Sequence, residues 1–207
     1  MFLIEWFLYL GVAAAGVSGA LVGIKKELDF FGVLFLGGVT ALGGGFVRDV
    51  LIGNVPPIGF LYPSYFWVST VAGLLTWLFY TRIDRLRIFI LVSDAIGLGV
   101  FTAVGADSAV KFGFDEPFLV ISMGLITGIG GGVLRDVFVK EIPFVFRKEV
   151  YAIASIVGAA CYYYSTWTLP AIGAMFLCLI VTFVIRIGSI WLKIDFPVYK
   201  ENKPGPQ

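Results

Sequence analysis

The sequence predicts an all-α polytopic membrane protein. It is 59% hydrophobic and only 14% charged, whereas a soluble domain has about 25% charged residues. Seven apolar segments follow one another, and a membrane-spanning helix needs about 20 such residues. Two of these segments carry the same motif, three glycines followed two residues later by Arg-Asp. We therefore expect seven transmembrane helices, arranged as two inverted three-helix repeats plus one extra helix.

The seven expected spans are joined by short connections. They cover residues 4–23, 30–52, 64–81, 88–106, 118–139, 149–166 and 169–190. The first has no basic residues before it and is long for a signal peptide, so we interpret it as a retained helix. The expected units are a first repeat (1–87), a second repeat (88–166), a seventh helix (167–190) and a cytoplasmic tail (191–207).

Basic residues lie almost entirely on one side of the expected bilayer. The loops opposite to them hold only Lys111. The basic side carries Lys25, Lys26, Arg82, Arg85, Arg87, Lys140, Arg147, Lys148, Lys193, Lys200 and Lys203. Positively charged loops stay in the cytoplasm, so we expect the N-terminus outside and the C-terminus in the cytoplasm.

The repeat follows from a constant spacing in the sequence. Arg48 and Asp49 recur 87 residues later as Arg135 and Asp136, and glycine, threonine and proline positions recur at the same spacing. Each copy holds three spans, which is an odd number, so the second copy enters the bilayer from the opposite face. Inverted repeats of this kind are common in transporters, where the site lies near the bilayer midplane.

A glycine triplet lies just past the middle of the second and fifth spans. The triplets are Gly43, Gly44, Gly45 and Gly130, Gly131, Gly132. Each glycine costs about 1 kcal/mol relative to alanine in a helix, and we expect both helices to kink there. Carbonyls freed by a kink need water or an ion as partners, which predicts a narrow wet path. Close helix packing is the simpler interpretation of the triplets alone.

Charged residues follow each triplet inside the spans. The candidates for a gate are Arg48, Asp49, Arg135, Asp136 and Asp94. Charges within a membrane are functional candidates by default. Neighbouring helix positions point about 100° apart, so we expect each arginine to pair across the two copies or with freed carbonyls. Asp94 is expected to pair with one of the arginines, and Arg186 to snorkel toward the membrane surface.

Several classes of site are excluded by what the chain lacks. The sequence has no histidine, which removes His-based metal sites, His proton relays and Ser-His-Asp catalysis. It also has no Gly-x-Ser-x-Gly motif. We therefore expect no enzyme activity, no metal, no cofactor and no nucleic-acid partner. Cys161 and Cys178 fall within spans and are expected to be packing residues without a disulfide.

The doubled Gly-Gly-Gly-x-x-Arg-Asp motif, with Pro56 and Pro143 downstream, resembles the prokaryotic branch of the trimeric intracellular cation (TRIC) channels. That branch overlaps a bacterial family of putative glycine transporters, and the resemblance extends from Gly16 to about Arg186. It implies a homotrimer in the cell membrane of a prokaryote, with a water-filled pore through each protomer for potassium or sodium ions. It also implies helix kinks at both triplets and a gate at or near the Arg-Asp pairs.

Two functions stay open at this point. A monovalent-cation channel agrees with the inverted repeat and the intramembrane acids, provided that each arginine is neutralised by an aspartate, because arginines near a pore repel cations. A secondary carrier for a small zwitterion such as glycine is the alternative, since an Arg and an Asp match its carboxylate and ammonium groups.

Overall fold

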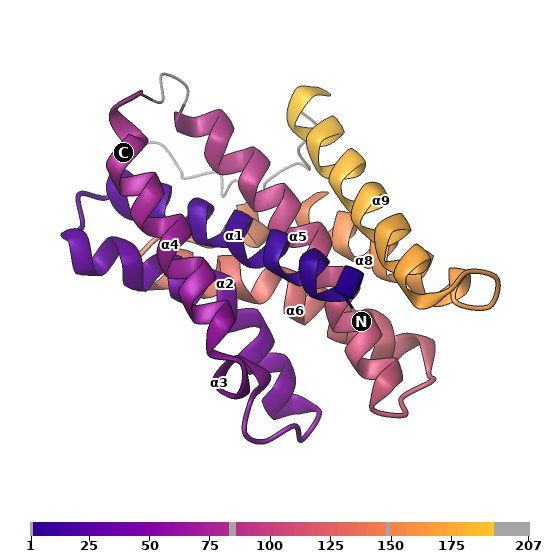
Figure 1. The fold of residues 1–207 in the computed structure, drawn as a ribbon. Coiled ribbons are helices and arrows are strands. Elements are labelled where there is room, and N and C mark those ends of the chain that lie inside the picture. Colours follow the sequence, from indigo (N-terminus) through magenta and orange to yellow (C-terminus); the bar gives the residue numbers. More distant parts are fainter. Residues whose placement is uncertain (1, 83–85, 148–149, 193–207) are drawn as a thin grey trace, which may run out of the picture.

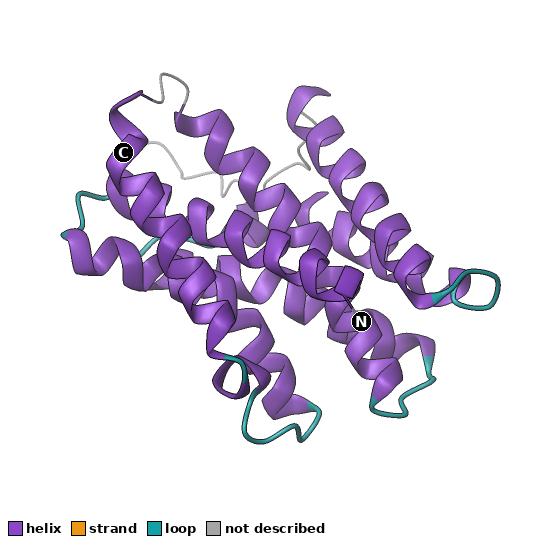
Figure 2. Cartoon of the chain, in the orientation of Figure 1, coloured by secondary structure: helices purple, strands orange, loops and turns teal. Residues whose placement is uncertain are grey.

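The computed structural model describes residues 2–82, 86–147 and 150–192, and this part of the chain is helical apart from its connections (Figures 1 and 2). Its long helices are α1 (Phe2–Lys25), α2 (Phe30–Leu51), α4 (Pro63–Phe79), α5 (Leu86–Lys111), α6 (Pro117–Phe138), α8 (Val150–Ser165) and α9 (Ala171–Leu192). Short helices are α3 (Ile58–Leu61), α7 (Phe144–Arg147) and the 3-10 turn Tyr80–Arg82. The predicted all-α class is confirmed.

The prediction of seven complete membrane crossings is not confirmed. Five helices, α1, α2, α5, α6 and α9, are long and apolar enough to cross a membrane. In contrast, α4 has 17 residues and α8 has 16, at the lower limit of a spanning length. The predicted cytoplasmic tail lies outside the described residues from position 193 onward.

The largest error in a predicted boundary concerns the fourth span. It was expected to end at residue 106, but α5 continues to Lys111. The extra turn holds Asp107, which pairs with Lys111 at 2.6 Å and accepts a hydrogen bond from the Tyr162 hydroxyl at 2.9 Å. A carboxylate with two partners can be buried, so the helix does not end at this acid.

Four helices form the centre of the molecule. Helix α1 packs on α2 and α5, and α6 packs on α2 and α5 (Figure 1). Helix α4 covers α1 and α2, and α8 covers α5 and α6 in the equivalent way. Helix α9 has no counterpart in the first half and packs on α5 and α8. The two halves therefore share one arrangement, and α9 is the addition.

Equivalent helices of the two halves run antiparallel. Gly11 of α1 lies against Val100 of α5, whereas Ala15, further along α1, lies against Gly97, earlier in α5. The sequence positions rise in one helix as they fall in the other. The same reversal holds between α2 and α6, as their glycine contacts show below. The structure therefore has the predicted inverted repeat.

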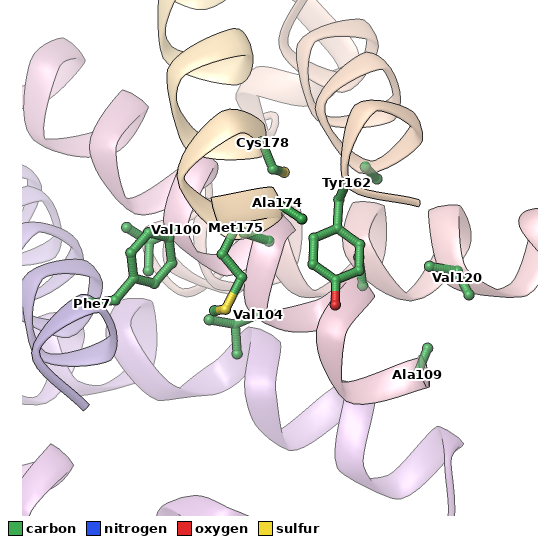
Figure 3. Packing of buried hydrophobic residues seen from close by; sticks show 12 residues of the cluster. Phe7, Val100, Val104, Ala109, Val120, Tyr162, Ala174, Met175 and Cys178 are labelled. Carbon is green, nitrogen blue, oxygen red and sulfur yellow. The ribbon is translucent and has the colours of Figure 1, made fainter. Parts of the chain in front are cut away.

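A buried apolar cluster connects the added helix to the centre. Figure 3 shows Met175 of α9 and Tyr162 of α8 beside Val100 and Val104 of α5, with Phe7 of α1 at one edge. Lipid tails are as apolar as these side chains, so close packing rather than exclusion from water holds such helices together. The cluster thus fixes α9 through shape.

The glycine triplets lie where α2 crosses α6. A Cβ on Gly44 would lie 2.2 Å from the Thr127 carbonyl oxygen, and one on Gly131 would lie 2.1 Å from that of Thr40. Both helices continue without interruption through their triplets. The predicted kinks are therefore not confirmed, and the visible role of these glycines is a close backbone crossing.

We expect the substitution Gly44→Ala to destabilise the protein because its methyl group would meet a backbone carbonyl that cannot move aside. Overpacking of this kind lowers the melting temperature by about 2–10 °C in a chain of this size. Gly38→Ala is the matched control, since its Cβ on the same helix would have no neighbour nearer than 4.0 Å. Thermal unfolding in detergent measures both, and equal melting temperatures would contradict the close crossing.

Candidate functional site

Each arginine of the repeated motif pairs with the aspartate that follows it. The Arg48 Nε donates to Asp49 Oδ1 at 2.9 Å, and the Arg135 Nε donates to Asp136 Oδ1 at 2.8 Å. All four side chains are buried. The expectation that the arginines pair across the two copies is therefore wrong.

Each arginine pairs with its own aspartate because that aspartate also makes a second contact. Its other carboxylate oxygen accepts a hydrogen bond from the first residue of the following short helix. Asp49 Oδ2 binds the Ile58 N–H at 2.7 Å, and Asp136 Oδ2 binds the Phe144 N–H at 2.9 Å. These bonds hold each carboxylate beside its own arginine. The prolines before both short helices were a weak sequence signal for these two bonds.

Arg135 is the centre of a larger group of polar contacts. Its Nη1 donates to Asp94 Oδ1 at 2.6 Å and to Ser18 Oγ at 2.9 Å. The expectation that Asp94 pairs with one of the arginines is confirmed. We call Arg135, Asp136, Asp94 and Ser18 the second-repeat cluster. It joins α1, α5 and α6 through charge-assisted hydrogen bonds, which are about twice as strong as neutral ones.

The first repeat lacks the extra members of this cluster. The spacing between α1 and α5 is 86 residues, and pairs of glycines obey it, such as Gly19 and Gly105. At this spacing Leu8 corresponds to Asp94, and Val104 corresponds to Ser18. The repeated arginines thus have different surroundings, because only Arg135 has the additional polar partners Asp94 and Ser18.

A cavity of about 190 Å³ lies beside Arg48 and Asp49. Leu8 and Val104 line it, together with other apolar side chains from α1, α2 and α5. The Asp107–Lys111 ion pair supplies further polar groups, and Thr127 of α6 also borders the cavity. The volume equals that of about six waters at liquid density.

A second, much smaller cavity of about 10 Å³ lies beside Asp94 and Gly132. Its volume is close to the minimum that one water needs. Phe101 lines both cavities, and Thr40 lines the smaller one as Thr127 lines the larger. The two cavities therefore flank the α2–α6 crossing and are separate from each other.

The second-repeat cluster borders the small cavity through Asp94. Asp94 Oδ2 and Arg135 Nη2 are buried, and neither has a hydrogen-bond partner among the described residues. Buried polar atoms of this kind ordinarily bind water. No group of three or more acidic, Cys or His side chains suited to a metal occurs within residues 2–82, 86–147 and 150–192. The site is therefore a set of neutralised, buried charged groups beside two cavities between the helices.

The chain matches known sequences over nearly its whole length, and the match to a family model occurs twice. A family model described as Glycine transporter matches residues 5–81 and again residues 91–167. The UPF0126 inner membrane protein YadS of Escherichia coli is 37% identical over 209 residues, covering 98% of this chain and 99% of the relative. A UPF0126 membrane protein of Vibrio cholerae is 39% identical over 210 residues, covering 98% of this chain and 84% of the relative.

Solved structures share the whole architecture. The crystal structure of a prokaryotic TRIC channel is 36% identical, with a TM-score of 0.88 over 93% of this chain and 98% of that one. A TRIC orthologue from Rhodobacter sphaeroides is 30% identical, with a TM-score of 0.88 over 94% of this chain and 100% of that one. The predicted resemblance is confirmed. The chain belongs to the glycine-transporter family of UPF0126 membrane proteins, which shares its fold with the prokaryotic TRIC channels.

Proposed function

We propose that this protein is a channel for monovalent cations, with potassium and sodium as the permeant ions. The observation that carries the proposal is the interrupted path along the α2–α6 interface. A cavity of about 190 Å³ enters from the side of Arg48, and the second-repeat cluster closes the other side. The solved relatives, named as cation channels, support the same assignment.

The charge pattern explains how cations pass two arginines. Arg48 is neutralised by Asp49, and Arg135 faces the two carboxylates of Asp136 and Asp94. A pore lined in this way does not repel cations as free arginines would. In this proposal Arg135 is the gate, and opening requires it to release Asp94 and Ser18.

The proposed setting is the cell membrane of a prokaryote, with three copies of the chain as a homotrimer in the lipid bilayer. The distribution of basic residues places the N-terminus outside. The large cavity, which the first turns of α1 line, then faces outward, and the second-repeat cluster faces the cytoplasm. We place one pore within each protomer, so that trimerisation adds stability rather than pore-forming residues.

Single-channel recording in a planar bilayer tests the proposal directly. With a potassium chloride gradient, we expect discrete currents whose reversal potential has the sign of the potassium equilibrium potential. Replacing potassium by sodium is expected to preserve the currents. An absence of unitary currents under every voltage and ion condition would overturn the proposal, and reversal toward the chloride potential would reject the cation preference.

Two acids on α5 are expected to act differently on the currents. Asp94→Asn removes a charge-assisted bond to Arg135 and is expected to raise the open probability about tenfold. Asp107→Asn keeps an acceptor for Tyr162 but removes a negative charge from the large cavity. We expect a lower unitary conductance with little change in open probability. If both variants changed the same parameter, the separation of gate and vestibule would be wrong.

A carrier for a small zwitterion such as glycine is the second candidate. The description of the matched family model favours it, and the large cavity contains both a carboxylate–guanidinium and a carboxylate–ammonium pair. Saturable uptake of labelled glycine into proteoliposomes, lost in Arg48→Ala, is the expected result for a carrier. Uptake that stays at the level of protein-free liposomes would reject this candidate.

A further inference from the structure

Arg186 is a buried charge on the helix outside the repeat. It was expected to snorkel to the membrane surface, but only 3% of it is exposed. The buried face of α9 continues from Cys178 through Thr182 and Arg186 to Ser189. The snorkelling prediction is therefore wrong, because this face, unlike the lipid-facing one, turns toward α8.

Two glycines hold Arg186 in place by letting α9 approach its neighbours. A Cβ on Gly158 of α8 would lie 1.9 Å from Thr182 Oγ1, and one on Gly99 of α5 would lie 3.0 Å from the Leu179 carbonyl oxygen. Thr182 lies one helical turn before Arg186. The arginine thus cannot turn toward lipid without separating two closely packed helices.

The guanidinium of Arg186 stacks on a tyrosine that contacts the second-repeat cluster. Its Cζ atom lies 4.8 Å from the centre of the Tyr151 ring. Tyr151 is itself buried, and its hydroxyl and Asp94 Oδ1 both lie within 4 Å of the position that a Cβ on Gly132 would occupy. Cation–π contacts of this kind strengthen when both groups are removed from water. Arg186 is therefore linked to the cluster through one aromatic side chain.

The contact between Arg186 and Tyr151 bears on the charge balance of the second-repeat cluster. The second-repeat cluster contains one cation, Arg135, and two carboxylates, Asp94 and Asp136. A buried charge without a counter-charge is strongly destabilising, and Arg186 supplies the missing positive charge. Its Nε has no hydrogen-bond partner among the described residues, so packing alone gives no reason for an arginine here.

The first repeat provides an internal comparison. Arg48 and Asp49 balance each other there, because Leu8 replaces the second acid. Tyr65, the equivalent of Tyr151, packs against the Tyr9 ring at 5.5 Å between centroids, with the two ring planes tilted by 56°. The position of Tyr9 in the second repeat is occupied by Ala95. A buried arginine therefore accompanies the half with the extra carboxylate, and an aromatic pair accompanies the other.

We propose that Arg186 is a positioning residue for the gate, which neutralises Asp94 through Tyr151 and so couples α9 to the second-repeat cluster. With Arg186 present, Asp94 has a second source of positive charge and can release Arg135. The functional meaning of this coupling rests on the proposed channel activity. The charge balance itself does not, and it can be measured on the purified protein without any current.

A double-mutant cycle tests the charge balance. Arg186→Gln is expected to lower the melting temperature in detergent by roughly 5–10 °C, because Asp94 and Asp136 then share one cation. Adding Asp94→Asn removes the excess negative charge and is expected to recover at least half of this loss. Arg186→Lys keeps the charge and is expected to lose less than Arg186→Gln. Ser189→Ala controls for packing on the same face of α9.

The outcomes separate the two proposals. Losses that simply add in the double variant would overturn the role of Arg186. If Arg186→Gln alone does not fold, recovery of folded protein in the double variant supports the role, and continued misfolding overturns it. In recordings, Arg186→Gln is expected to lower the open probability at least threefold. Rescue of stability in a protein that carries no current would retain the charge balance and reject the channel.

Discussion

The close antiparallel crossing of α2 and α6 is the contact on which the rest of the structure depends. At Gly44 and Gly131 the two backbones approach to distances that no side chain permits. The crossing places the arginine of each repeat on its own side of the interface, one helical turn beyond the third glycine. It also narrows the space between the cavities to a polar seam of threonines and backbone. Such a close contact needs a glycine at the same depth in both α2 and α6. The motif therefore occurs once in each helix.

Equal motifs in unequal surroundings produce a structure with one closed side. An inverted repeat would by itself give two identical ends, and Arg48 and Arg135 do keep the same bond to the following aspartate. The difference lies in α1 and α5. At equivalent positions of the repeat, α1 has Leu8 where α5 has Asp94, and α5 has Val104 where α1 has Ser18. Two apolar side chains leave a cavity beside Arg48, and two polar ones bind Arg135. These two departures from the repeat are therefore sufficient to make its two ends different.

The sequence was sufficient for the helices and the repeat, because hydropathy, basic loops and a constant spacing each act over many residues. It was not sufficient for the pairing of Arg48 with Asp49, which depends on where Ile58 turns back to meet the carboxylate. Glycine content alone also cannot distinguish a kink from a close crossing, since both need the absence of Cβ. Arg186 was readable in principle, because Cys178, Thr182 and Ser189 share its face, and a charge in a stripe of small residues indicates burial.

The arrangement of acids around Arg135 limits the free-energy cost of opening. Asp136 also binds the Phe144 N–H, so it remains beside the arginine while the bond to Asp94 breaks. Arg135 then keeps one counter-charge throughout, and no bare guanidinium is exposed to hydrocarbon. The carboxylate that it leaves is the group that needs compensation, and water or a permeating cation can reach it from the small cavity. Until one arrives, Arg186 on the Tyr151 ring is a second fixed positive charge beside the cluster. Helix α9 lies outside the repeat and thus supplies a positive charge that the repeated motif, with one arginine and one aspartate in each copy, cannot.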